Sequence, residues 1–184
     1  MAVFCGSGLA LEYPILPTRI TEDDIVVCVQ GDEPMLVPDM IDAVVAPLKK
    51  APSVPCTMLA MHITEEAICN PDTVKLIHND AGEVLYTSRA PVPHCKGLFT
   101  PALGARRIYG TFAFRWRYLK AFTQHPETRL GKLEAWDSNR ILDMSFRQHI
   151  APYPYIESFS VDSSDDIKLF EKHVASDRFW RLYK

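Results

Sequence analysis

The chain has 184 residues, of which 47% are hydrophobic and 23% are charged, and its formal net charge is −3. This composition is typical of one globular domain and excludes a disordered or fibrous chain. A slightly acidic chain offers no basic field for DNA or RNA, and no apolar run reaches the roughly 18 residues of a membrane span. The five cysteines form no CxxC pair, which indicates reduced thiols rather than a disulfide framework or a zinc site. We therefore expect one cytoplasmic domain over residues 1–184, without nucleic-acid partners or membrane insertion.

The first part of the chain alternates apolar runs with helical patterns. Residues 1–23 carry little regular pattern and are expected to be irregular. A continuous apolar run at residues 25–29 predicts a strand buried on both faces. A helix is predicted over residues 38–50, because proline and aspartate stand at its start. Residues 56–63 then predict a strand, and residues 64–67 open a short helix.

The middle of the chain predicts a hairpin and a further strand. Residues 73–78 and 84–87 are its two arms, and the Asn-Asp-Ala-Gly sequence at residues 79–82 is typical of a turn. Residues 90–104 hold three prolines and two glycines, which predicts a long loop. Residues 107–114 predict the next strand.

The last part of the chain returns to helical patterns. We expect helices over residues 116–123 and 130–144, and a late strand over residues 156–161. Residues 163–166 have the serine and acidic residues of a helix start. Strands that alternate with helices predict an α/β fold with a mostly parallel sheet and flanking helices, and the hairpin makes the sheet mixed.

Two aspartates follow predicted strands. Asp32 comes directly after residues 25–29, and Asp162 follows residues 156–161. In open α/β sheets, ligands bind beyond the carboxyl ends of the strands, and Gly31 permits a close backbone approach. The two carboxylates could share one Mg²⁺ beside a phosphate. Taken singly, Asp32 also fits a turn residue and Asp162 a helix N-cap, so spacing alone leaves both readings open.

Several segments of the chain form an ordered set with the sequences VQGDEP, NPDTVK, LYTSRAPVP, GTFAFR, LGKLEAWDSNRIL and VDSSDD, at residues 29–34, 70–75, 85–93, 110–115, 130–142 and 161–166. In this order they resemble the 3-deoxy-manno-octulosonate cytidylyltransferases (CMP-Kdo synthetases). The resemblance covers roughly residues 22–175, and an ordered set is far more specific than one motif. It implies a Rossmann-like fold of the nucleotide-diphospho-sugar transferase kind.

The resemblance also implies a reaction. The anomeric hydroxyl of Kdo attacks the α-phosphorus of CTP and gives CMP-Kdo and pyrophosphate, with Mg²⁺, for lipopolysaccharide precursor synthesis. Asp32 and Asp162 match the catalytic, metal-binding aspartates of the family, and Gln30 matches a residue near the sugar. A homodimer is expected.

Further residues match the sugar side of the family's site. Ser88 and Arg89 match a loop that closes the pocket, and Glu134 matches an acidic residue at the sugar. Arg89 could bind the sugar carboxylate through two N–H groups. Lys75 and Arg107 are further cationic candidates, for which a solvated surface position is the alternative.

The chain departs from the family's pattern at its amino terminus. The family begins with a strand and a glycine-rich basic loop that binds the CTP triphosphate, and residues 1–24 do not reproduce them. Ile108 and Ser160 also replace the expected residues. We therefore expect an amino-terminally incomplete domain in which strand 25–29 lacks a neighbour and exposes an edge, with lower stability or dimerisation as the result. Two alternatives are a diverged, non-catalytic relative that serves as a binding protein, and a nucleotidyltransferase for another sugar.

Overall fold

The computed structural model describes residues 2–5, 19–97, 99–100, 104–136, 138–158, 160–161, 163–174 and 180. Its strands are β1 (Ala2–Cys5), β2 (Ile25–Val29), β3 (Cys56–His62), β4 (Lys75–His78), β5 (Val84–Ser88), β6 (Arg106–Arg115) and β7 (Gln148–Tyr153). Its helices are α1 (Pro38–Lys50), α2 (Glu65–Cys69), α3 (Trp116–Gln124), α4 (Arg129–Glu134), α5 (Ser138–Asp143) and α6 (Ser164–Val174).

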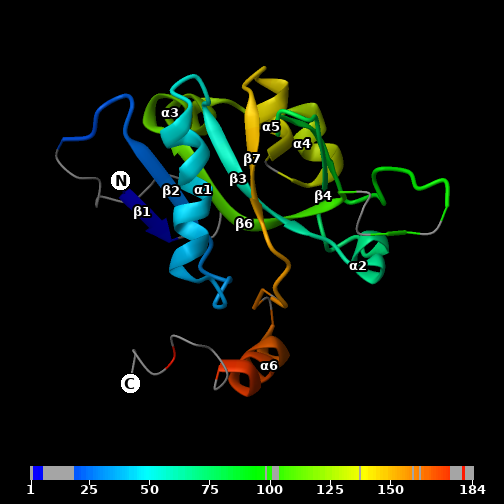
Figure 1. The fold of residues 1–184 in the computed structure, drawn as a ribbon. Coiled ribbons are helices and arrows are strands. Elements are labelled where there is room, and N and C mark those ends of the chain that lie inside the picture. The colour runs from blue at the N-terminus through cyan, green and yellow to red at the C-terminus, as the bar shows by residue number, and fades with distance from the viewer. Residues whose placement is uncertain are drawn as a thin grey trace.

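The described strands form one seven-stranded sheet (Figure 1). Its main order is β1-β2-β6-β3-β7, and β4 joins β5 to β6. β1 and β2 pair in parallel, as do β3 and β7, whereas β6 runs antiparallel to β2, β3 and β4. Since β5 and β6 run against the other described strands, the sheet is mixed, with two parallel and four antiparallel pairings, and the predicted α/β fold is confirmed.

Side chains alternate between the two faces of the sheet and give it two cores. Val26 and Met58 pack on one face with side chains from α3 and α5, and the neighbouring Val27 and Leu59 pack on the other face with side chains from α1. Figure 1 shows α1 packed against the sheet, with α4 and α5 grouped near β7 and β4. This sandwich fixes the strand ends that build the site.

Most local predictions are confirmed. Helix α1 has the predicted bounds, and α3 ends one residue beyond its prediction. The hairpin is β4 and β5, and the Asn79 side chain accepts hydrogen bonds from the N–H groups of Ala81 and Glu83. Thr64 caps α2 by accepting from the Ala67 N–H at 3.2 Å.

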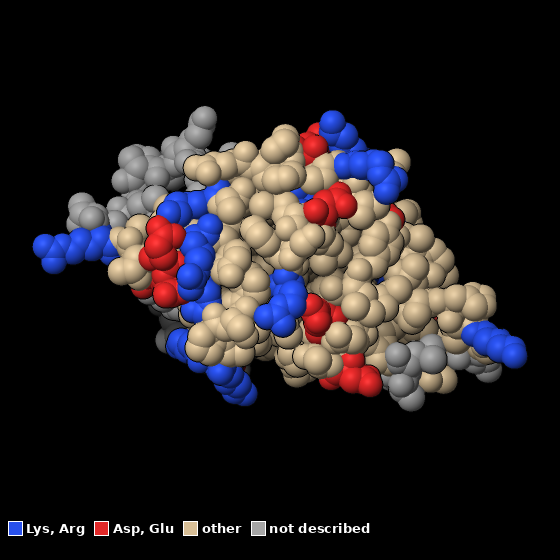
Figure 2. All heavy atoms as spheres, turned by 90° about the horizontal axis from the view of Figure 1, so that it is seen from above, with Lys and Arg blue, Asp and Glu red and all other residues tan. Residues whose placement is uncertain are grey.

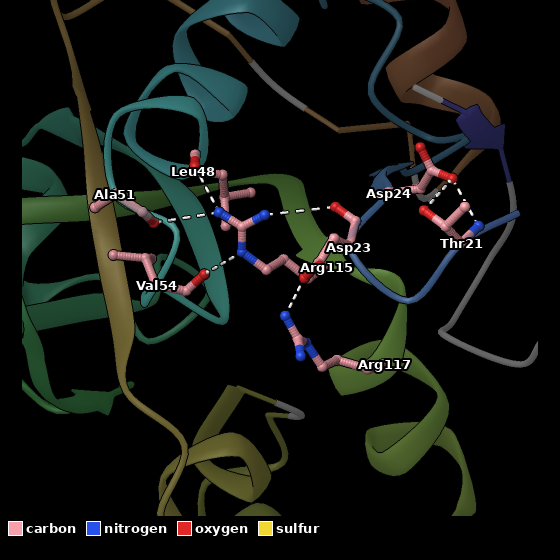
Figure 3. A network of polar contacts seen from close by, with 8 residues as sticks. All are labelled: Thr21, Asp23, Asp24, Leu48, Ala51, Val54, Arg115 and Arg117. Carbon is pink, nitrogen blue, oxygen red and sulfur yellow. Dashed lines mark hydrogen bonds and ion pairs between the residues drawn. The ribbon is translucent and has the colours of Figure 1, made fainter.

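A buried arginine joins α1 to the sheet (Figure 3). Arg115, at the end of β6, is 7% exposed and donates to the carbonyl oxygens of Leu48, Ala51 and Val54. These carbonyls belong to the last turn of α1 and the loop after it, where the helix dipole favours a cation. Arg115 therefore caps α1 from the neighbouring strand.

The prediction that strand 25–29 lacks a neighbour is wrong. Residues 2–5 form β1, which pairs in parallel with β2 from Ala2 opposite Val26 to Cys5 opposite Val29. A pattern of four residues is too short to reveal a strand without its partner, which explains why residues 1–23 were predicted to be irregular. β2 thus has β1 on one side and β6 on the other. Because β2 has a neighbour on both sides, the exposed edge of β2 and the lower stability that it implied are not expected.

The single helix predicted over residues 130–144 is two helices, α4 and α5. The chain leaves α4 at Ala135, whose φ of +47° lies in the left-handed region. The Arg89 side chain binds the carbonyl oxygens of Glu134 and Ala135, so those carbonyls have a partner outside the helix. A tertiary contact therefore ends the helix that the apolar spacing predicts to continue.

The late strand is also displaced. It lies at β7, parallel to β3, and the described part of residues 156–161 is not a strand. Pro152 within β7 disfavours a strand prediction, but β7 is the end strand of the main order, where a proline is tolerated. The chain then reaches α6, whose start is the predicted serine and acidic pair: Ser163 and Asp166 bind each other through side chain and backbone.

The described surface carries charges of both signs. Figure 2 shows basic and acidic side chains interspersed over the face seen from above, without a broad field of one sign. No helix of the described residues combines the length and apolar character needed to cross a membrane.

Candidate active site

A cavity of about 610 Å³ lies beyond the carboxyl end of β2. Its described walls come from the turn after β2, the loop before β4, the middle of β6 and the segment that leads into α6. Four of the predicted site residues line it: Gln30, Asp32, Arg89 and Arg107. Segments far apart in sequence therefore meet where an α/β sheet usually binds ligands.

The Gln30 side chain lies against the backbone of Gly110 on β6. A Cβ at position 110 would overlap the Gln30 Oε1 and lie 2.9 Å from its Cδ and 3.1 Å from the Glu33 Oε1. Only a glycine leaves this space to the two side chains. The glycine of the GTFAFR segment and the glutamine of VQGDEP are thus two parts of one wall.

The turn after β2 is joined to the segment before α6. The Val161 N–H donates to the Asp32 carbonyl oxygen at 2.8 Å, and the Ser160 hydroxyl donates to the Glu33 Oε1 at 3.0 Å. Arg107, on β6, also donates to the Ser158 hydroxyl. Asp162 itself lies outside the described residues, and its predicted pairing with Asp32 stays a prediction. Its chain neighbour Val161 does contact Asp32.

Two carboxylates stand side by side in this turn. Burial raises the pKa of Glu33, and the nearby Asp32 charge adds to this, while the hydrogen bond from Ser160 and the charge of Arg107 act against it. Burial and the Glu33 charge also raise the pKa of the Tyr109 hydroxyl. The Oδ1 atom of Asp32 is buried and has no hydrogen-bond partner in the described structure. A carboxylate oxygen left in this state suits a cation from outside the chain.

Ser88 and Glu134 lie together, but neither is among the described residues that line the cavity. The Glu134 carboxylate accepts hydrogen bonds from the Tyr86 hydroxyl at 2.9 Å, the Ser88 hydroxyl at 2.8 Å and the Arg89 N–H at 3.0 Å. Burial alone would raise the pKa of Glu134, but these hydrogen bonds and the Arg89 charge lower it overall. In this arrangement the two predicted sugar-site residues fix the backbone at Arg89.

The Arg89 side chain spans two loops. Its Nε donates to the Glu134 carbonyl at 3.1 Å, and its terminal nitrogens donate to the carbonyls of Pro71 at 3.0 Å and Ala135 at 3.4 Å. A guanidinium has five N–H donors, so donors beyond these three remain for a ligand in the cavity.

Lys75, a further cationic candidate, is not among the described residues that line the cavity. It is fully buried, and its ammonium donates to the carbonyl oxygens of Asn70 at 2.8 Å, Thr73 at 2.7 Å and Arg89. Burial and the Arg89 charge lower its pKa. The solvated surface position considered for this residue is therefore wrong, and its ammonium is occupied by the protein backbone.

Sequence reasoning missed several residues of the cavity wall. Tyr109, Trp136, Ser158 and Asp166 line it, although none was a candidate. The strand period offered one signal, because Tyr109 lies two residues after Arg107 and shares its face. For Trp136 the sequence holds no such signal, because the position of Trp136 depends on the left-handed turn at Ala135.

The described residues contain no group of three or more His, Cys, Asp or Glu side chains arranged to bind a metal. Asp32 is the described residue that fits one best, because of its unpaired, buried Oδ1 in the cavity wall. Cys28, Cys56, Cys69 and Cys95 are unpaired in the described structure, and their reduced state stays a prediction.

Comparison with known proteins matches this architecture. The model of the cytidylyltransferase family matches residues 16–150. A 3-deoxy-manno-octulosonate cytidylyltransferase of Acidobacterium capsulatum is 32% identical over 168 residues, which are 91% of this chain and 66% of that protein. One of Nitratidesulfovibrio vulgaris strain DP4 is 36% identical over 150 residues, which are 80% of this chain and 59% of that protein.

The fold has a solved counterpart. A structure of CMP:2-keto-3-deoxy-manno-octonic acid synthetase in complex with CTP superposes with a TM-score of 0.74 at 24% identity, over 85% of this chain and 64% of that one. This likeness confirms the predicted α/β architecture. The chain spans less than two thirds of the length of these relatives. From the family match over residues 16–150 and these relatives, the chain belongs to the cytidylyltransferase family, as its ordered motifs predicted.

Proposed function

We propose that the chain carries the sugar side of a cytidylyltransferase that transfers CMP from CTP to the anomeric hydroxyl of Kdo, for lipopolysaccharide precursor synthesis. The observation that carries the proposal is the convergence of motif residues on one cavity: Gln30, Asp32, Arg89, Arg107 and Gly110 all line it. The names of the relatives support the same reaction. The hydroxyl oxygen attacks the α-phosphorus of CTP, the bond to the pyrophosphate oxygen breaks, and the hydroxyl proton is lost.

The cavity offers groups suited to an acid sugar. Arg89 and Arg107 are two cations in its wall, and a guanidinium can bind a carboxylate through paired N–H groups. The Gln30 amide can donate to or accept from a sugar hydroxyl. Positioning of the nucleophile and neutralisation of phosphate charge supply most of the catalysis in such transfers. These residues therefore orient the sugar.

We also propose Mg²⁺ as the cofactor. Asp32 would bind it through its unpaired carboxylate oxygen, together with Asp162, which the sequence places directly after the Val161 that contacts Asp32. The metal would supply positive charge against the phosphate oxygens of CTP. The Asp32 carboxylate is then needed in its ionised form.

A pyrophosphate-release assay with CTP, Kdo and Mg²⁺ tests the proposal. Wild-type protein should release pyrophosphate only when all three are present, and D32A should be at least about 100-fold slower. R117M is a matched control, because Arg117 forms an exposed ion pair with Asp23 away from the described cavity wall. Turnover by D32A equal to that of the wild type would overturn the assignment of Asp32.

The second candidate is a non-catalytic relative that binds ligand with the same cavity. The departures from the family's pattern at Ile108 and Ser160, two residues of the cavity wall, favour this candidate. Calorimetry separates the two candidates. Binding of Kdo without CTP binding or pyrophosphate release supports the binding protein, whereas binding of both substrates with turnover supports the enzyme. A nucleotidyltransferase for another sugar would show turnover only when Kdo is replaced by that sugar.

We further propose a cytoplasmic homodimer. Leu85 and Leu133 are 56% and 71% exposed, and they flank the contact between Tyr86 and Glu134, so two apolar side chains face outward from β5 and α4. Sedimentation velocity over a range of concentrations tests this. A monomer throughout the range would contradict it.

A further inference from the structure

Lys75 is a charged side chain with no access to solvent. It is 0% exposed, and in the described part of the chain its ammonium forms no salt bridge. Each of its three N–H donors is matched by a carbonyl oxygen, from Asn70, Thr73 and Arg89. A buried ammonium is costly unless its donors are satisfied, so the three carbonyls must stay in place around it.

The three carbonyls belong to two walls of the cavity. Asn70 and Thr73 belong to the loop before β4, and both line the cavity, as does Arg89 after β5. The same two walls meet a second time, because the Arg89 side chain donates to the Pro71 carbonyl. Lys75 therefore sets the distance between the loop and the arginine from behind, while its own side chain stays out of the cavity.

We propose that Lys75 is a positioning residue that fixes Arg89 against the loop of residues 70–74, and that the cavity binds its acid-sugar ligand through Arg89 in that fixed place. The binding part of this inference rests on the proposed function. The positioning part concerns the ligand-free protein and does not depend on the proposed function. Binding through Arg89 loses less conformational entropy when Lys75 has already fixed the backbone of the arginine.

Arg115 provides a matched control within the same chain. It too is a buried cation whose acceptors are carbonyl oxygens, at Leu48, Ala51 and Val54. None of these three residues lines the cavity. K75M and R115M therefore remove the same kind of interaction, one behind the cavity and one away from it.

The first measurement is amide hydrogen exchange of the ligand-free protein, with NMR as the readout. The reporters are the N–H groups of Asp72, Thr73 and Arg89, which bind Asn70 and Glu134. K75M should exchange them at least about tenfold faster relative to core amides, whereas R115M should not. The inference is overturned if K75M speeds these amides only as much as R115M does.

The second measurement is calorimetry with Kdo on a double-mutant cycle. K75M should weaken Kdo binding by roughly tenfold in the wild-type background and by much less in an R89A background. The reason is that Lys75 affects Kdo binding through the Arg89 side chain, which R89A has already removed. K75R should restore part of the affinity. Equal effects in the two backgrounds would overturn the action through Arg89. If wild-type protein does not bind Kdo, the proposed function fails, and the exchange experiment alone decides the role of Lys75.

Discussion

The Gln30 side chain occupies the space that a Cβ of Gly110 would need. Its Cδ lies 2.9 Å from that position, and its Oε1 lies closer still. Gln30 follows β2 and Gly110 lies within β6, so two neighbouring antiparallel strands determine the place of one amide group. The contact links the fold to the cavity, because both residues line it.

Replacement of Gly110 by alanine should separate binding from stability. The methyl group displaces the end of a flexible side chain rather than backbone, so we expect the free energy of unfolding to change by less than about 1 kcal/mol. The Gln30 amide moves out of its place, and Kdo binding should weaken by about tenfold or more. Urea unfolding and calorimetry on the same sample measure the two effects.

G97A is the control for this change. Apart from Gly97 and its chain neighbours, no atom of the described residues lies within 4 Å of the place that a Cβ would take at Gly97, and its φ is not positive, so alanine should leave both stability and binding as they are. Loss of more than about 3 kcal/mol in G110A would mean that the backbone of β6 moves, which would contradict the amide displacement.

The sequence predicts the frame of the site better than its details. The run at residues 25–29 predicts β2, and the ordered motifs identify Gln30, Asp32 and Arg89, all of which line the cavity. These predictions succeed because an apolar strand and the turn after it are local features.

The failures depend on contacts between distant parts of the chain. The helix predicted over residues 130–144 breaks at Ala135 because Arg89, far away in sequence, binds the carbonyls at the break. Lys75 was a candidate for ligand contact because sequence reveals its charge, but not the three carbonyls that surround it. Whether a charged side chain is buried can be predicted only when the groups that bind it are known.

Glu134 should stabilise the fold in a pH-dependent way. Its pKa in the folded protein is lowered below the ordinary value of 4.5, where burial opposes the shift and hydrogen bonds from Arg89, Ser88 and Tyr86 produce it. A carboxylate with a lowered folded pKa stabilises above its unfolded pKa, and the stabilisation is lost as the pH falls through the folded value. E134Q should therefore be less stable than the wild type by about 1 kcal/mol at pH 7, and the difference should shrink below pH 4.5.

Urea unfolding at pH 7, 5.5 and 4 checks this prediction. E127Q is the control, because Glu127 forms an exposed ion pair with Lys132 and should contribute less than about 0.5 kcal/mol at each pH. A difference between E134Q and the wild type that grows as the pH falls would contradict the assigned hydrogen bonds.

Arg115 should be one of the costliest charged side chains to remove. Its guanidinium binds the carbonyls of Leu48, Ala51 and Val54, and a fourth bond reaches the carbonyl of Asp23 at 3.4 Å (Figure 3). R115M leaves these buried acceptors without a donor, so we expect a loss of about 3 kcal/mol in the free energy of unfolding. R115K keeps the charge but has fewer donors, and should recover part of the loss.

Arg117 separates this effect from loss of charge alone. Its ion pair with Asp23 is exposed, with side chains 45% and 66% accessible, so R117M should cost less than about 1 kcal/mol in urea unfolding. Both arginines lie at the junction of β6 and α3 and both contact residue 23, but Arg115 is buried and has four carbonyl acceptors, whereas Arg117 is exposed and has one carboxylate partner. Equal losses in R115M and R117M would show that α1 does not depend on a cap from β6, and the anchoring of α1 would then have to come from its apolar face alone.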